Sequence, residues 1–258
     1  MRQRLQQWYT ATSEAFSSRD LAVHKPALYI LIGTLGVIGV LWALVYAVDV
    51  LNMFDVASQR GLWWHLFRNR GPVEWLQWLF LSATFLLAAF LAGRASERND
   101  RTEMIFWLLI SVGFTLMLIE DAGDPRHLSA GYINEFTGLH RRYVETVYFM
   151  FIAAPLVYAW IRYRGVMLKY AATRLYVFAG GLLYGLAAVG SAMREYRSFY
   201  YVIGDWLTEI VTSNAIPGFF LIDFVLEESV ELLGGALLFC AVLVYWRMDR
   251  ETTPNSNR

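Results

Sequence analysis

Charged residues are scarce in this sequence. Asp, Glu, Lys and Arg make up 17% of its 258 residues, whereas hydrophobic residues make up 57% and aromatic residues 16%. A soluble domain has about 25% charged and about 45–50% apolar residues. A chain with so little polar surface cannot cover itself in water, so the composition predicts a membrane protein.

The sequence also lacks an excess of either charge and a pair of cysteines. Its 22 basic and 22 acidic residues cancel, so no basic field indicates a nucleic-acid partner. Cys240 is the single cysteine, which excludes a disulfide framework within the chain. The glycine patterns of nucleotide-binding loops and the Gly-x-Ser-x-Gly motif of hydrolases are absent too. No catalytic residue and no organic cofactor site is predicted.

Long apolar runs are abundant. A helix needs about 20 mostly apolar residues to cross the roughly 30 Å hydrocarbon core of a bilayer. We predict one all-α domain, a polytopic bundle of about six transmembrane helices, with residues 1–25 as a tail or interfacial helix and 247–258 as a second tail. The six predicted spans are Ala27–Val48, Val73–Gly93, Met104–Glu120, Tyr143–Ile161, Leu175–Met193 and Val225–Trp246.

The basic residues predict the orientation. With a cytoplasmic N-terminus, the four inner segments carry 14 of the 22 Lys and Arg residues and the three outer segments carry eight. Cytoplasmic segments are normally enriched in Lys and Arg, so both termini are expected inside. We expect a multi-pass protein of a prokaryotic plasma membrane, with membrane lipids as its surroundings; an oligomer is compatible with the sequence.

Glycine and proline indicate where helices approach one another or end. Small residues that predict close helix packing lie in three spans. They are Gly33, Gly36 and Gly39 in the first span, the small-xxx-small pair Gly181 and Gly185 in the fifth, and Gly234 and Gly235 in the sixth. Residues 200–222 are aromatic and apolar but are interrupted by Pro217 and Gly218. They are expected to form either an interfacial helix or a re-entrant segment.

Acidic residues concentrate on the predicted outer side, which holds 15 of the 22. Spans two, four and six each open with a Val-Glu pair, at Glu74, Glu145 and Glu231. An acid near a helix N-terminus is stabilised by about 0.3–1 kcal/mol, so this position alone does not indicate a function.

The acids that open the sixth span are harder to explain structurally. Asp223, Glu227 and Glu231 are spaced four residues apart on one helical face, and Glu228 lies beside them. Only about fifteen apolar residues follow Glu231, so a spanning helix carries some of these carboxylates to the hydrocarbon boundary. There they are expected to face a bundle interior or a cavity, neutralised by protons or by a cation.

The end of the third span is a second candidate site. Glu120, Asp124 and His127 offer oxygen and nitrogen ligands for a divalent metal ion, and His140 and Glu145 could complete the set. The same Glu120–His127 string, with Gly and Asp-Pro, also predicts a simple turn at a helix exit. Both interpretations stay open at this point.

Two segments resemble a group of uncharacterised prokaryotic multi-span membrane proteins. They are Gly71–Leu76, which reads GPVEWL, and Glu227–Gly234, which reads EESVELLG. The third span of that group ends in a Gly-Glu-Glu-Ile-Ser-Trp-Gly-Gln-like string, of which this chain keeps only the acidic pair at Glu120 and Asp121. The resemblance implies that Glu74, Glu120, Glu228 and Glu231 form one set, and it implies no activity.

Three functions fit these patterns. The leading one is an outward-facing acidic pocket between the second, third, fourth and sixth spans that binds a cation, in the transport or sensing of a metal ion or proton. The alternatives are a metal-dependent hydrolase or transferase acting on lipid-linked substrates, and a non-catalytic scaffold whose acids only form salt bridges and caps. The candidate cation ligands are Glu120, Asp124, His127, Glu145, Glu228 and Glu231, supported by Glu74, Asp223 and Glu227.

Overall fold

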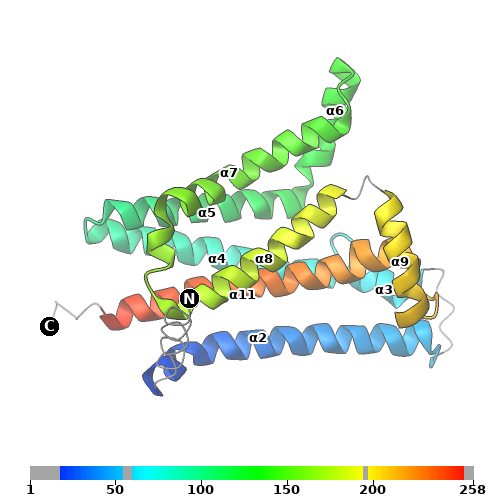
Figure 1. Ribbon diagram of the computed structural model, residues 1–258, viewed down its shortest axis with the longest axis horizontal. Coiled ribbons are helices and arrows are strands. Elements are labelled where there is room, and N and C mark those ends of the chain that lie inside the picture. The colour runs from blue at the N-terminus through cyan, green and yellow to red at the C-terminus, as the bar shows by residue number, and fades with distance from the viewer. Residues whose placement is uncertain (1–17, 55–59, 194–196, 253–258) are drawn as a thin grey trace, which may run out of the picture.

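The structure is a helical bundle. The computed structural model describes residues 18–54, 60–193 and 197–252, and within these ranges it contains helices, turns and no β-strand (Figure 1). This confirms the all-α prediction. The elements are α2 (Ser18–Val45), the π-helix η1 (Tyr46–Val50), α3 (Gly61–Phe67), α4 (Pro72–Glu97), α5 (Arg101–Gly123), α6 (Pro125–Thr137), α7 (Arg141–Met167), α8 (Ala171–Met193), α9 (Arg197–Val211), α10 (Gly218–Phe220), the π-helix η2 (Leu221–Leu226) and α11 (Glu227–Thr252).

The long helices coincide with the predicted spans. Among the described residues, five helical segments are long and apolar enough to cross a membrane. The fifth predicted span falls in α8, which holds a shorter apolar stretch, Ala171–Ala187. The apolar helices indicate a membrane-embedded protein. The predicted N-terminal tail or interfacial helix lies largely outside the described residues.

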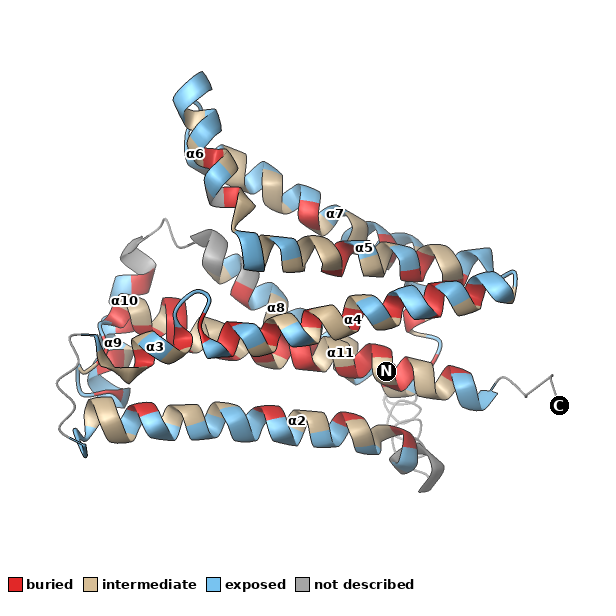
Figure 2. Cartoon of the chain, turned by 180° about the vertical axis from the view of Figure 1, so that it is seen from behind, coloured by how far each residue is buried: buried red, intermediate tan, exposed pale blue. Residues whose placement is uncertain are grey.

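Helix α11 is the centre of the bundle and α2 lies at its margin. Over their apolar windows, 56% of the residues are buried in the segment containing α11 but only 11% in the one containing α2. Figure 2 shows the same contrast between these two helices. α11 packs against α8, α4 and α2, while α4 packs against α5 and α5 against α7. Elements that meet at α11 are therefore fixed relative to one another.

The glycine prediction is confirmed at Gly234 and is wrong for the glycines of the first and fifth spans. A Cβ on Gly180 would lie 2.9 Å from the backbone nitrogen of Leu238, and one on Gly234 would lie 2.9 Å from that of Tyr184. These two glycines allow α8 and α11 to cross closely. A Cβ added to any of the predicted glycines of the first and fifth spans would have no neighbour within 4 Å; these are Gly181, Gly185, Gly33, Gly36 and Gly39.

The segment at 200–222 folds across one end of the bundle. α9 runs transverse to the long helices (Figure 1). The chain then returns so closely that a Cβ on Gly204 would lie 2.2 Å from the carbonyl oxygen of Gly218. The Thr208 hydroxyl donates to the carbonyl of Ile216 at 3.1 Å, which closes the turn. This transverse packing favours the interfacial over the re-entrant interpretation.

The opposite end is held together by ion pairs. Arg98 donates to Asp249 of α11 at 2.6 Å and to Glu103 of α5 at 2.9 Å. Arg94 lies 3.5 Å from Asp249, and the Tyr245 hydroxyl donates to Glu103 at 2.9 Å. Burial lowers the pKa of Arg98, but its bond to Asp249 and the charge of Glu103 outweigh burial and raise the pKa above its ordinary value. Both buried carboxylates therefore have a permanent cationic partner.

Candidate functional site

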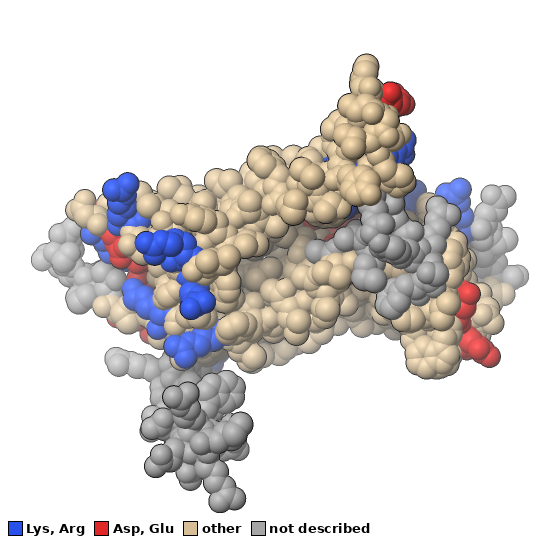
Figure 3. Space-filling model, turned by 45° about the horizontal axis from the view of Figure 1, so that its top comes forward, with Lys and Arg blue, Asp and Glu red and all other residues tan. Residues whose placement is uncertain are grey.

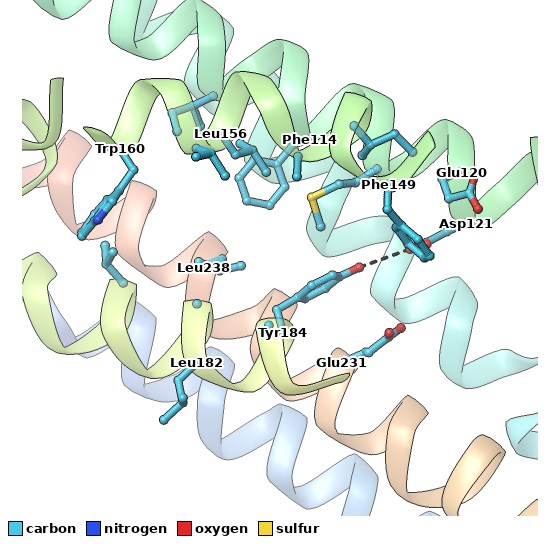
Figure 4. Close-up of a pocket in the computed structure, with 18 of the residues that line it drawn as sticks. Phe114, Glu120, Asp121, Phe149, Leu156, Trp160, Leu182, Tyr184, Glu231 and Leu238 are labelled. Atoms are coloured by element: carbon cyan, nitrogen blue, oxygen red, sulfur yellow. Dashed lines mark hydrogen bonds between the residues drawn. The ribbon is translucent and has the colours of Figure 1, made fainter. Parts of the chain in front are cut away.

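A cavity of about 1150 Å³ separates two pairs of helices. α7 packs against α5 and α6, whereas α8 packs against α11, so these consecutive helices have little contact with each other. Side chains from α5 and α7 face side chains from α8 and α11 across the resulting space (Figure 4). The cavity exists because α7 and α8 pack against different helices.

Most of the cavity wall is apolar. On α5 the lining extends from Phe106 to Asp121, about four turns or roughly 22 Å along the helix axis. Rings from three helices contribute to this part, and Figure 4 shows several of them pointing inward. The aromatic lining residues other than tyrosine are Phe106, Trp107, Phe114, Phe149, Trp160 and Phe178.

One end of the cavity is strongly acidic. Among the described residues, eight carboxylic residues and two arginines, Arg70 and Arg126, line the cavity, so the fixed charge of this lining is negative. The acids come from α4, from the α5–α6 junction, and from η2 with the start of α11. They are Glu74, Glu120, Asp121, Asp124, Asp223, Glu227, Glu228 and Glu231.

Gln77 connects the acidic residues of three helices. Its side chain is fully buried, and its amide nitrogen lies 3.0 Å from Oδ2 of Asp121, 2.8 Å from Oε2 of Glu231 and 3.0 Å from the hydroxyl of Tyr184. The Tyr184 hydroxyl in turn donates to Asp121 at 3.3 Å (Figure 4). An amide nitrogen carries two hydrogens, so three acceptors share two donors. Asp121 and Glu231 are thus neighbours that compete for neutral donors.

Glu228 lies beside this cluster with an unsatisfied oxygen. Its Oε2 is buried and has no hydrogen-bond partner among the described residues, and the same holds for Oε1 of Gln77. A buried polar atom without a partner costs free energy, more so when it is charged. A proton or a bound cation at Glu228 would remove that cost.

Two other acids have partners of their own. The backbone N–H of Arg70, just before α4, donates to the carboxylate of Glu74 in the first turn of that helix. Glu120 pairs with Arg126 at 3.1 Å, and the guanidinium of Arg126 lies 4.3 Å from the ring centre of Phe149. The favourable position of an acid near a helix N-terminus therefore accounts for Glu74, whereas Glu120 is held by its ion pair with Arg126.

The chain before α11 positions the last group of acids. η2 is a π-helical segment, in which wider turns change the direction of successive side chains, and such turns are frequent at functional sites. Asp223 lies within it and is 4% exposed. Glu227 follows at the start of α11 and accepts a hydrogen bond from Tyr200 of α9 at 3.0 Å. The transverse helix α9 therefore covers one side of the acidic end.

The structure gathers most of the predicted site residues. Seven of the nine line the cavity: Glu74, Glu120, Asp124, Asp223, Glu227, Glu228 and Glu231. Glu145 is not among its lining residues, and neither is His140, whose ring packs near Tyr143. The side chain of His127 lies outside the described residues. The four acids implied by the resemblance share this one cavity.

The turn predicted at Glu120–His127 is present. α5 ends at Gly123, Asp124 adopts a left-handed conformation with φ of 51°, and α6 begins at Pro125. In the part of the chain that the structure describes, no group of three or more His, Cys, Asp or Glu residues is arranged to hold a metal ion. A divalent metal at the predicted ligands stays a prediction.

Gln77, Tyr184 and Asp121 were absent from the predicted site. Gln77 lies three residues after Glu74, so the two share a helical face, which was the available signal. Tyr184 is one tyrosine in an apolar span, and nothing in the sequence distinguishes it from an interfacial aromatic residue. Asp121 was noticed only as part of the acidic pair with Glu120.

Comparisons with known proteins assign no family to this chain. No protein-family model matches it, and neither a curated protein nor a solved structure matches it significantly. The residues of the cavity itself therefore carry the functional interpretation. Carboxylates that share neutral donors are suited to taking up positive charge.

Proposed function

We propose that this membrane protein binds a cation at the acidic end of the cavity, in the transport or sensing of a proton or a small metal ion. One observation carries the proposal. Asp121 of α5 and Glu231 of α11 both accept from the amide of Gln77, and none of the described residues forms an ion pair with either. Like charges held this close favour uptake of a positive charge between them.

The choice between proton and metal follows from the donor geometry. A resident metal ion takes several protein ligands at once, typically four for zinc and six to eight for calcium. No such group exists among the described residues. Protons, or a cation that keeps most of its water, need no preformed cage. This observation also disfavours the metal-dependent hydrolase or transferase.

The charge distribution supports the proposed orientation. Figure 3 shows Lys and Arg side chains gathered at one end of the molecule. This is the end where α4 and α11 finish and where Arg94, Arg98 and Asp249 meet. By the positive-inside rule that end faces the cytoplasm. The acidic end of the cavity then opens to the outer side of the plasma membrane, for which we propose a prokaryotic cell.

Cation titration of the purified protein tests the proposal. Metal-free wild type in neutral detergent is titrated with Na⁺, Mg²⁺, Ca²⁺, Mn²⁺ and Zn²⁺ by calorimetry, and proton release is recorded at each addition. Wild type is expected to bind a cation saturably or to exchange protons in the titrated range. The variant Glu228→Gln/Glu231→Gln is expected to lose this response, because both substitutions remove charge without changing side-chain size.

A matched double variant controls for unspecific charge effects. Glu209 of α9 and Glu251 of α11 are exposed and lie outside the cavity lining. Glu209→Gln/Glu251→Gln removes the same charge and is expected to behave as wild type. If all three proteins respond identically, the acids of the cavity are structural, and the scaffold function replaces the one proposed.

A further inference from the structure

The cavity is much larger than a proton or a metal ion requires. A water molecule occupies about 30 Å³ in the liquid, whereas the cavity measures about 1150 Å³. Sites for drug-sized molecules are about 300–1,000 Å³ and mostly apolar, with a few polar groups that fix orientation. The long aromatic wall and its one acidic end follow that pattern.

We infer that the cavity binds an amphiphilic organic cation, with an amine or quaternary ammonium head at the acidic end and an apolar body along α5 and α7. This inference rests on the proposed function and names its ligand class. An anionic or zwitterionic lipid would bring a phosphate toward the eight carboxylates and two arginines of the described lining. The charge of the lining thus favours a cationic head.

The chain's own Arg126 occupies such a position. Its guanidinium lies between the carboxylate of Glu120 at 3.1 Å and the ring of Phe149 at 4.3 Å, and Arg126 is only 9% exposed. A carboxylate beside an aromatic face is the arrangement that recognises organic cations in proteins. The acidic end therefore already stabilises one organic cation inside the cavity wall.

Glu228 offers a second, unused position. Its Oε2 is buried, has no partner among the described residues, and belongs to a residue of the cavity lining. Tyr184 also lines the cavity, and its hydroxyl is fixed by Gln77 and Asp121. A cationic head there would neutralise Glu228.

The apolar part of the cavity is open toward the lipid. Val157 of α7 and Phe178 and Leu182 of α8 line the cavity, yet they are 52%, 57% and 62% exposed. Large apolar residues that are exposed within spanning helices face lipid in a membrane. An amphiphile dissolved in the bilayer can therefore enter between α7 and α8 without crossing water.

Binding of three probes with the same tail tests the inference. Wild type in phosphatidylcholine nanodiscs is equilibrated with radiolabelled dodecyltrimethylammonium, dodecanol or dodecanesulfonate, and binding to empty nanodiscs is subtracted. The cation is expected to bind saturably and at least tenfold more tightly than the other two. Equal binding of all three would overturn the inference, because it would indicate a cavity for lipid tails, and so would the absence of saturable binding.

Two glycine variants separate this inference from the proposed function. Gly181 lines the cavity with nothing within 4 Å of an added Cβ, whereas Gly33 of α2 is equally open but lies outside it. Gly181→Phe is expected to abolish dodecyltrimethylammonium binding and to keep the small-cation response, while Gly33→Phe keeps both. Unchanged amphiphile binding in Gly181→Phe would overturn the inference alone, whereas a small-cation response that is absent even in wild type contradicts the proposed function.

Charge variants complete the test. Glu228→Gln is expected to weaken dodecyltrimethylammonium binding at least tenfold, with Glu209→Gln as the exposed control. The elution volume and thermal unfolding of each variant show whether it is folded. A folded Glu228→Gln protein that binds the cation as wild type does would contradict the role given to this carboxylate.

Discussion

Buried carboxylates have different partners at the two ends of the bundle. At the basic end, Asp249 and Glu103 each bond to Arg98, and their neighbours complete a closed network. At the acidic end, Asp121 and Glu231 share the neutral amide of Gln77, and Glu228 keeps an oxygen without a partner among the described residues. Carboxylates that are paired with arginine indicate a structural role, whereas buried carboxylates without a cationic partner can bind a ligand. The contrast within one chain is therefore more informative than either end alone.

Removing Arg98 should have the largest effect on stability. Arg98→Ala leaves Asp249 and Glu103 buried, and breaking a buried ion pair costs about 3–5 kcal/mol. We expect a loss of about 3 kcal/mol in the free energy of unfolding, measured by denaturant titration in mixed micelles. The exposed neighbour Arg101 serves as the control, since Arg101→Ala should change stability by less than about 0.5 kcal/mol. Equal losses of stability in the two variants would contradict a structural role for the ion pairs of the basic end.

Neutralising one acid at each end should give effects of opposite sign. Asp249→Asn removes a charge that has arginine partners and should destabilise the protein. Glu228→Gln removes a buried charge without a hydrogen-bond partner in the described chain and should stabilise it by about 1 kcal/mol, because such a charge carries a desolvation cost. The gain should be larger at high pH, where wild type must ionise Glu228, than at low pH. Unfolding at two pH values measures both signs, and a destabilised Glu228→Gln protein would contradict the comparison.

The smallest expected effect separates function from stability. Tyr184→Phe and Tyr245→Phe each remove one hydroxyl that donates to a carboxylate, at the acidic and basic ends respectively. Each should lose about 1 kcal/mol of stability, which is typical of one hydrogen bond. Only Tyr184→Phe should also weaken the cation response in calorimetry. A similar weakening in Tyr245→Phe would show that the response depends on general stability.

The bundle and an acidic pocket were predictable, but the size of the cavity and its long apolar part were not. Apolar runs of span length, such as Ala27–Val48, identify membrane helices because the bilayer sets their length. Whether consecutive helices touch depends on tertiary packing, and no local pattern indicates that α7 and α8 separate. The acids were therefore expected to line a pocket, whereas the apolar wall that continues from them was not expected.

Two neighbouring glycines show most clearly what sequence patterns cannot predict. Gly180 lies against the backbone of α11, whereas the adjacent Gly181 faces the cavity, although a sequence motif favoured Gly181 for packing. Gln77 was missed because one amide in an apolar helix carries no periodic signal. Its role depends on Asp121 and Glu231, which lie 44 and 154 residues away along the chain.

The central claim is that the carboxylates of the acidic end hold a proton or a cation. Infrared spectra of metal-free wild type and Glu228→Gln/Glu231→Gln, recorded over the pH range in which both are folded, test it most directly. We predict a carboxylic-acid C=O band in wild type that the variant lacks and that disappears when pH rises or a bound cation is added. Identical spectra for the two proteins throughout that range, with and without the cation, would contradict the account.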